Sequence, residues 1–419
     1  MHDDRWRPGT ERGGTTMPAT QPPAAKNGIA AGVLAILLEN GEATRKSIAA
    51  VLGVSLPTVT TVLGDLEARG FVRELRREQG PRGRATLVYG LDDTAGWVVG
   101  VDIGSTQVSV LAQHLDGTVL ARLDRAVETG DPLSAALAAG ALVASVLAAE
   151  RRRGHPVSVG VGVNQVVPKS FSPSDDGTTA VMVSALVRAS GLPSTVPVVV
   201  ENNVNCAAVA EHEDGDLRGV DDGGYLQIGV GIGLGFFADG ALIRGSSGAS
   251  GELAQIPLAW DAAVDSPRNA IEHAYGSRGL LATVRSEWPE GEPPASSEQV
   301  FALAATGDPV ASSVMRRHAT AIARVATAVA TVLDPSVLVI GGGLSRNPEF
   351  VALVVEEFRS RIPRTEVRTS RKGTAATVQG AAFLARDHAS SILLGGAYRR
   401  ILSRPAIWSP ADAAEGAIA

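Results

Sequence analysis

The sequence contains only one cysteine, Cys206. A lone cysteine excludes an internal disulfide and a cysteine-based zinc cluster, and it is typical of the reducing cytoplasm, where we place this chain. No uninterrupted apolar run approaches the roughly 20 residues that a membrane-spanning helix needs, so we predict no membrane partner. The formal net charge of −6 gives no overall positive field toward nucleic acids, so any DNA-binding surface has to be local.

Length and composition predict a globular protein of more than one domain. A chain of 419 residues exceeds one ordinary core, and a hydrophobic content of 45% with 20% charged residues is typical of folded proteins. Residues 1–27 are polar and rich in Gly, Pro and Thr, which predicts a disordered leader. Residues 391–419 are Pro/Ala-rich and predict a tail that packs only in part. Two domains remain between them, at 28–91 and 97–390.

Residues 28–91 have the pattern of a winged helix-turn-helix. A first helix is expected over 30–38, a second is capped by Thr44, and a third begins after Ser55 and is closed by Gly70. Two β-prone stretches, FVREL and ATLVYGL, then flank the arginine-rich segment RREQGPRGR. Helix, helix, short turn, helix and hairpin is the order of a winged helix-turn-helix, in which the third helix enters the major groove.

The candidate DNA contacts lie on the outer face of the third helix and on the hairpin. They are Ser55, Pro57, Thr58, Thr60, Thr61, Arg73, Arg76, Arg77, Arg82 and Arg84. Residues 30–90 contain seven Arg and one Lys against six acids, a net of +2, which leaves about −8 for the rest of the chain. Phosphate contacts should therefore supply much of the affinity. The alternative is a solvated arginine-rich loop on a protein-interaction domain.

After residue 91 the chain alternates between strands and helices. Strand-like segments occupy 158–167, 196–203, 224–240 and 336–343, and a hairpin is expected from residue 97. Helical segments lie at 133–152, 206–213 and 310–333. This alternation predicts two α/β lobes that close on a cleft.

Three glycine turns follow strands in this body, namely DIGST, GVGIG and GGGLS. Backbone N–H groups in such turns can converge on phosphate oxygens, and an aspartate beside one can hold Mg²⁺ through water. The candidate nucleotide-binding residues are Asp102, Gly104, Thr106, Gly229, Gly231 and Gly342. A purely structural role as tight turns is the alternative for these glycines.

Residues 97–390 resemble the ROK family of repressors, open reading frames and kinases. The resemblance is carried by DIGST (102–106), ENNVNCAAVAE (201–211), GVGIGLGFFADGALIRG (229–245), SGE (250–252), DPSVLVIGGG (334–343) and VQGAAFLA (378–385). It implies an actin-like ATPase fold. The amino-terminal module resembles the winged helix-turn-helix of the family's repressors, whose wing carries a turn like GPRGR.

The resemblance also implies which functional groups this chain lacks. The family's sugar kinases have Glu-Asn-Asp where this chain has 201–203, and their Asp accepts the proton of the sugar hydroxyl; here that position is Asn203, an amide that cannot do so. The family's zinc site, one His and three Cys, is replaced by Gln255 and by a segment without cysteine. We therefore predict no metal, no cofactor and no catalytic residue.

The sugar contacts of the family map onto amides and carboxylates of this chain, which suit a polyol. They fall on Asn202, Asn203, Glu252, Gln255 and Glu272. Against this, the family's Pro-Gly turn reads Asn164-Gln165, so a glutamine side chain can fill space that a sugar would need.

These observations predict a sugar-responsive transcriptional regulator, most simply a repressor, that is not an enzyme. Its partners are operator DNA and a small carbohydrate or sugar derivative, and the family and the need for two half-sites imply a homodimer or a dimer of dimers. One alternative is an active ATP-dependent sugar kinase that carries a DNA-binding domain. Another is an architectural DNA-binding protein with a vestigial pocket.

Overall fold

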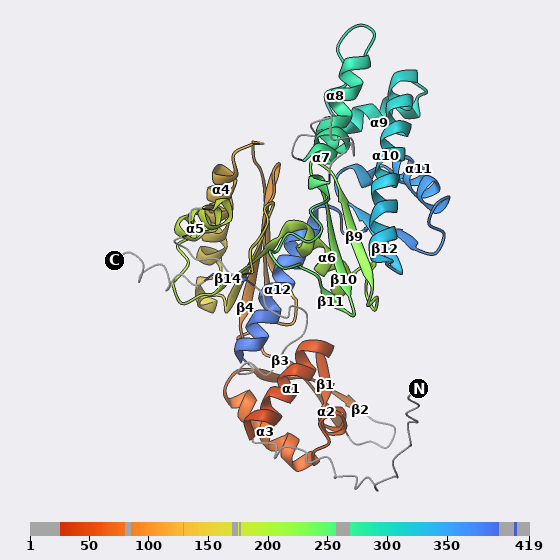
Figure 1. The fold of residues 1–419 in the computed structure, drawn as a ribbon. Coiled ribbons are helices and arrows are strands. Elements are labelled where there is room, and N and C mark those ends of the chain that lie inside the picture. Colours follow the sequence, from red (N-terminus) through yellow and green to blue (C-terminus); the bar gives the residue numbers. More distant parts are fainter. Residues whose placement is uncertain are drawn as a thin grey trace, which may run out of the picture.

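The computed structural model describes residues 26–79, 85–128, 130–169, 175, 177–256, 269–393 and 406–408. These residues form a small amino-terminal domain and a larger body of two α/β lobes that stand side by side (Figure 1). The two-lobed α/β body predicted from the sequence is confirmed.

The amino-terminal domain combines three helices with a small antiparallel sheet. Its elements are α1 (Lys26–Asn40), β1 (Glu42–Thr44), α2 (Arg45–Leu52), α3 (Leu56–Ala68), β2 (Val72–Gln79) and β3 (Ala85–Leu91). The strands pair in the order β1-β3-β2. The sequence pattern predicts the β2–β3 hairpin but not β1, because β1 is only three residues long and exists through its pairing with β3.

Local signals in the sequence set the two helices of the helix-turn-helix. The side chain of Thr44 accepts the backbone N–H of Ser47 and caps α2, and Ser55 caps α3 through the N–H of Thr58, so both predicted caps are confirmed. Between the helices, Gly53 has a φ of 64°, a left-handed conformation that favours glycine. The tight turn therefore follows from the residue that occupies it.

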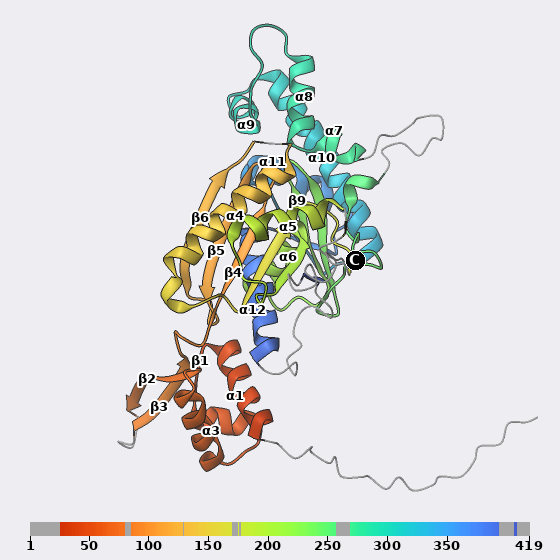
Figure 2. The same ribbon diagram turned by 90° about the vertical axis from the view of Figure 1, so that its left-hand side faces the viewer.

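The first lobe is built on a six-stranded sheet with the strand order β14-β8-β7-β4-β5-β6. These strands are β4 (Trp97–Ile103), β5 (Gln107–His114), β6 (Val119–Ala126), β7 (Ser158–Val163), β8 (Val198–Asn202) and β14 (Ala406–Trp408). Helices α4 (Pro132–Ala149) and α5 (Thr178–Ser190) cover one face of this sheet (Figure 2). Helix α4 has the length and apolar composition of a membrane span, but its buried residues belong to the core of this lobe.

The second lobe has a five-stranded sheet with the order β11-β10-β9-β12-β13. Its strands are β9 (Gly223–Ile228), β10 (Ile232–Ala238), β11 (Ala241–Leu242), β12 (Val337–Gly341) and β13 (Glu366–Thr369). Its helices are α7 (Ala270–Tyr275), α8 (Ser277–Glu287), α9 (Ser297–Ala305), α10 (Pro309–Leu333) and α11 (Pro348–Arg359). The core of this lobe lies between its sheet and these helices.

Two helices, α6 (Asn203–Asp214) and α12 (Ala376–Leu393), connect the lobes and pack against each other. One apolar cluster joins them to the sheet of the second lobe, with Cys206 from α6, Phe237 from β10 and Leu384 from α12. Glycines let the backbones approach: a Cβ atom on Gly380 would lie 1.7 Å from the carbonyl oxygen of Cys206. A Cβ atom on Gly160 of β7 would lie 1.9 Å from the carbonyl oxygen of Ala381.

The ends of the described chain differ from the sequence-based boundaries. Helix α1 begins inside the predicted 1–27 leader, because Ile29 and Val33 bury its apolar side in the domain core. Helix α12 continues to Leu393, past the predicted start of the tail at 391. Residues 406–408 add strand β14 antiparallel to β8 and bury Trp408, so part of the predicted tail completes the sheet.

Candidate functional site

The carboxyl end of β8 carries the polar residues that the sequence marks as a site. Glu201 is buried, and its Oε1 accepts the backbone N–H of Asn202 at 2.8 Å and the amide of Asn205 at 2.9 Å. Burial raises the pKa of Glu201, and the positive charge of Arg244 opposes that rise. Glu201 therefore belongs to the framework of the site and is not exposed to a ligand.

The two asparagines that follow Glu201 have different surroundings. The Oδ1 of Asn202 accepts the backbone N–H groups of Val204 and Asn205, and its Nδ2 donates to the carbonyl of Gln165 at 3.2 Å. Asn202 is thus the N-cap of α6, which explains why this helix starts at Asn203 and not at the predicted residue 206. The partly exposed side chain of Asn203 has no hydrogen bond to another described residue, and it remains available to a ligand.

A buried ion pair connects the carboxyl end of β8 to Arg244. The Nε of Arg244 lies 2.7 Å from Glu201 Oε2, with 7% and 1% of the two side chains exposed. Another guanidinium nitrogen of Arg244 donates to the carbonyl of Val167 at 3.4 Å. Asn202 and Arg244 therefore fasten the segment with Gln165 and Val167 to the end of β8. The sequence does not single out Arg244, because no local pattern connects it to a strand end some 40 residues earlier.

The two carboxylates among the predicted sugar contacts interact with each other. The predicted glutamine differs from them because it is exposed. The pKa of the half-buried Glu252 is raised by burial and then by the negative charge of Glu272. Glu272 also reaches the second glycine turn, since a Cβ atom on Gly231 would lie 3.2 Å from its Oε2. Gln255 is exposed at the end of a 3₁₀ turn. Glu252 and Glu272 thus form one acidic pair beside the turn predicted to hold phosphate.

The second and third glycine turns adjoin each other. A Cβ atom on Gly229 would lie 3.2 Å from the backbone nitrogen of Gly343, next to Gly342, whose φ of 93° favours glycine. The N–H of Ser277 donates to the carbonyl of Gly229 at 2.7 Å. A cavity of about 360 Å³ adjoins the third turn and is lined by residues that include Phe301, Gly343 and Arg346. None of the predicted sugar contacts lines this cavity.

The first glycine turn contains the carboxyl group of Asp102. Asp102 Oδ1 is buried and accepts no hydrogen bond from the described residues. Burial and the charge of Asp124 raise the pKa of Asp102 to about 7. Gly104 abuts the carbonyl of Gln107 across the hairpin, and Thr106 is exposed. A buried, unpaired carboxyl group is costly, and such groups occur where a ligand completes the site.

The segment that replaces the family's zinc loop lies mostly outside the described residues, at 257–268. Within the ranges that the structure describes, no three His, Cys, Asp or Glu side chains gather as metal ligands. Cys206 is buried within α6.

On the amino-terminal domain, the predicted DNA contacts of α3 are exposed, except for the partly buried Thr58. The predicted wing arginines are held by acids: Arg73 pairs with Asp93 at 2.8 Å, Arg77 with Glu74 at 2.7 Å, and Arg76 with Glu42 and Glu78. Exposed pairs of this kind contribute little to stability, so phosphates can replace the acids. Arg82 and Arg84 lie outside the described residues.

Lys46 is a further basic candidate that the sequence pattern did not single out. It is exposed in the first turn of α2 and forms no ion pair with a described residue. Its neighbour Arg45 donates to the hydroxyl of Tyr89 and lies over that ring. The signal was present in the sequence, because the first helix of a helix-turn-helix crosses the DNA backbone.

Comparisons with known proteins agree with this architecture. The profile of the ROK family matches residues 98–388, and that of a winged helix-turn-helix DNA-binding domain matches residues 28–73. An N-acetyl-D-glucosamine kinase of Escherichia coli O1:K1 is 28% identical over 311 residues, which cover 68% of this chain and 98% of the kinase. A xylose repressor of Caldicellulosiruptor bescii is 24% identical over 263 residues, which cover 60% of this chain and 65% of the repressor.

Two solved structures extend the comparison. A ROK family transcriptional regulator, a homolog of the E. coli MLC protein, has a TM-score of 0.65 and 20% identity, and covers 88% of this chain and 98% of its own; at this identity the likeness shows the fold. A ROK family glucokinase from Streptomyces griseus, in complex with glucose and AMPPNP, has a TM-score of 0.56 and 26% identity over 70% of this chain and 99% of its own. The chain belongs to the ROK family, and its amino-terminal winged helix-turn-helix makes it a DNA-binding regulator.

Proposed function

We propose that this regulator is a sugar-responsive repressor whose kinase-like body binds a small carbohydrate without phosphorylating it. The observation that carries the proposal is the position of α12, which packs against α6 beside the candidate site and also against the DNA-binding domain. The regulator acts in the cytoplasm as a homodimer or a dimer of dimers, because two half-sites require two reading heads.

The chemistry of the site favours binding over catalysis. The resemblance implies that Asn203 stands where the family's kinases have their general base. An amide cannot accept a hydroxyl proton near neutral pH. Its side chain forms no hydrogen bond with the described residues and can both donate to and accept from a sugar hydroxyl. The acidic pair of Glu252 and Glu272 adds hydroxyl acceptors.

Helix α12 provides a physical connection from the lobes to the DNA-binding domain (Figure 1). Near its carboxyl end, Ala385 and Ala389 belong to the same apolar cluster as Val33 and Leu37 of α1. Val98 of β4 belongs to this cluster as well. Because this packing is continuous, a change in the angle between the lobes moves α1 with α12, and the spacing of two reading heads changes in a dimer.

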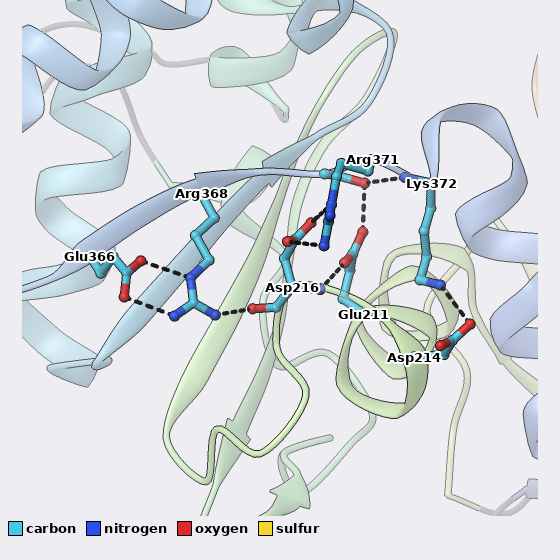
Figure 3. A network of polar contacts seen from close by, with 8 residues as sticks. Glu211, Asp214, Asp216, Glu366, Arg368, Arg371 and Lys372 are labelled. Carbon is cyan, nitrogen blue, oxygen red and sulfur yellow. Dashed lines mark hydrogen bonds and ion pairs between the residues drawn. The ribbon is translucent and has the colours of Figure 1, made fainter.

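The two crossovers between the lobes are tied together by a polar network (Figure 3). The chain leaves the first lobe through the end of α6 and returns to it between β13 and α12. Buried Glu211 of the first crossover accepts the hydroxyl of Ser370 at 2.6 Å. Arg371 donates to Asp216 at 2.9 Å, and Lys372 lies 3.6 Å from Asp214. The network joins the two crossovers, and in this proposal they act together as the hinge at which a ligand changes the angle between the lobes.

The test combines DNA binding with a sugar panel. The purified chain should bind a duplex from its own upstream region, and one sugar of the panel should release the duplex and raise the melting temperature. Asn203→Ala should weaken that sugar's effect on both measurements while leaving sugar-free DNA binding unchanged. Asn202→Ala should instead lower the melting temperature without sugar, because loss of the N-cap of α6 costs about 0.5–2 kcal/mol of stability. An unchanged sugar response in Asn203→Ala would contradict the proposed role.

The second candidate is an active sugar kinase with a DNA-binding domain. It is favoured by the unpaired Asp102 and by the adjoining turns at Gly229 and Gly343. ATP-dependent phosphorylation of hexoses and amino sugars by the purified chain, lost in Asp102→Ala, would establish it. If the chain binds DNA but no sugar alters its stability or its binding, the architectural protein with a vestigial pocket is the correct description.

A further inference from the structure

The outer face of the recognition helix α3 is apolar at its amino-terminal end. Leu56 at the first helical position is 50% exposed. Pro57, Thr60 and Thr61 are exposed on the same turns, and Gly64 follows one turn later with open space around it. This face is therefore open to a ligand at Leu56, Pro57, Thr60, Thr61 and Gly64.

The hydroxyl groups on this face are turned back toward the helix. Thr60 donates to the carbonyl of Leu56 at 2.9 Å, and Thr61 donates to that of Pro57 at 3.1 Å. Ser55 caps the helix and shares a 2.8 Å hydrogen bond with Thr58. The donors of Thr60 and Thr61 are therefore occupied within the helix, and their methyl groups remain for an approaching ligand.

Helix α3 also lacks the side chains that read bases by paired hydrogen bonds. Its sequence, LPTVTTVLGDLEA, contains no Arg, Lys, Asn or Gln, the residues that pair with guanine or adenine edges. Its acids, Asp65 and Glu67, lie in the second half of the helix, where phosphates would repel them. The amino-terminal half, from Leu56 to Thr61, is therefore the part that can enter the major groove.

We propose that α3 reads A·T pairs through thymine methyl groups, which Leu56, Thr60 and Thr61 contact in the major groove. The C5-methyl of thymine is the apolar group that distinguishes A·T from G·C pairs there, and Ala and Thr side chains contact it. Basic residues outside α3, including exposed Lys46 and the arginines of β2, supply the phosphate contacts. This inference rests on the proposed DNA-binding function and names the bases that it recognises.

The first experiment identifies the half-site. The purified full-length chain selects duplexes from a random library, and thymines are then replaced one at a time by uracil, which lacks only the methyl group. We expect T-containing half-sites, and a loss of about fourfold in affinity for each contacted methyl, the amount for burying one CH₂ group. Uracil placed outside the half-sites is the control and should have no effect.

The second experiment uses a matched pair of variants at one position. Thr60→Val keeps a methyl group and removes the hydroxyl, whereas Thr60→Ser keeps the hydroxyl and removes the methyl. We expect Thr60→Val to bind the selected duplex nearly as well as the parent chain. Thr60→Ser should bind it several-fold more weakly and respond less to uracil at the contacted thymine. Leu56→Ala should weaken binding in the same way, and circular dichroism checks that each variant is folded.

Three results would overturn the inference. One is the selection of G·C pairs at the positions that face α3. Another is binding that is insensitive to uracil, and a third is the reverse order of the two Thr60 variants, which would make the hydroxyl the reading group. These results would leave DNA binding itself intact. If the chain selects no duplex even at low salt, both the proposed function and this inference fall.

Discussion

Removing the positive charge from the buried ion pair at the site should lower the stability of the first lobe against unfolding. In Arg244→Met the apolar stem is kept, but Glu201 loses its partner at 2.7 Å while it stays 1% exposed. Removing one partner of a buried pair costs about 3–5 kcal/mol, because the remaining charge has no compensation. We therefore expect the free energy of unfolding to fall by about this amount at pH 8.

The defect should depend on pH with a definite sign. Burial already raises the pKa of Glu201 above its ordinary value of 4.5, and Arg244 limits the rise, so the variant raises it further. A carboxyl group whose pKa is higher in the folded than in the unfolded chain makes the protein less stable as the pH rises from the unfolded-state pKa toward the folded-state pKa. The deficit of Arg244→Met should therefore be large at pH 8 and smaller at pH 5.

Urea unfolding at the two pH values measures this difference, with tryptophan fluorescence as the signal, to which buried Trp97 and Trp408 of the same lobe contribute. The double variant Arg244→Met/Glu201→Gln should recover most of the loss, because glutamine still accepts the hydrogen bonds of Asn202 and Asn205. A deficit below about 1 kcal/mol at pH 8, or one equal at both pH values, would refute the reasoning.

Further predictions concern the first glycine turn, the lobe packing and the wing. Asp102→Asn should stabilise the chain by a few kcal/mol at pH 8 and by less at pH 5. The reason is that the folded-state pKa of about 7 lies above the ordinary value of 3.8, so the cost of keeping this carboxylate ionised in the folded chain grows with pH between these values. Urea unfolding at both pH values tests this. Gly380→Ala should lower the melting temperature because its Cβ meets the carbonyl of Cys206, whereas Gly64→Ala, with open space, should add up to about 1 kcal/mol. A destabilised Gly64→Ala beside an unaffected Gly380→Ala would contradict the packing. Arg77→Ala should weaken binding of all duplexes alike and reduce the salt slope by about 0.9, as measured by fluorescence anisotropy.

Much of the fold is visible in local sequence patterns. The caps at Thr44 and Ser55 and the hairpin after α3 depend on residues a few positions apart, so short-range rules suffice. The strands at 158–167 and 336–343 are apolar enough to be found without partners, although the structure ends them at Val163 and Gly341. Strand β14 could not be predicted in this way, because three residues become a strand only when β8 offers an edge.

The candidate site is only partly visible in the sequence. The run Glu201-Asn202-Asn203 marks its location, but the sequence does not show that these three polar residues have different roles. Only their contacts in the structure distinguish these roles. Glu201 is buried against Arg244, Asn202 caps α6, and Asn203 remains available. These contacts come from residues 2 to 43 positions away, so spacing along the chain contains no information about the more distant ones.

The sequence by itself determined the family, the order of the domains and the amide at position 203, since identity and short-range order are properties of the chain. The tertiary structure decided which polar groups are satisfied within the protein and which are left for a ligand. It also decided that α12 packs against both the lobes and the DNA-binding domain. The reason is physical: burial and hydrogen bonding depend on distances in space, and folding brings together residues that the chain keeps far apart.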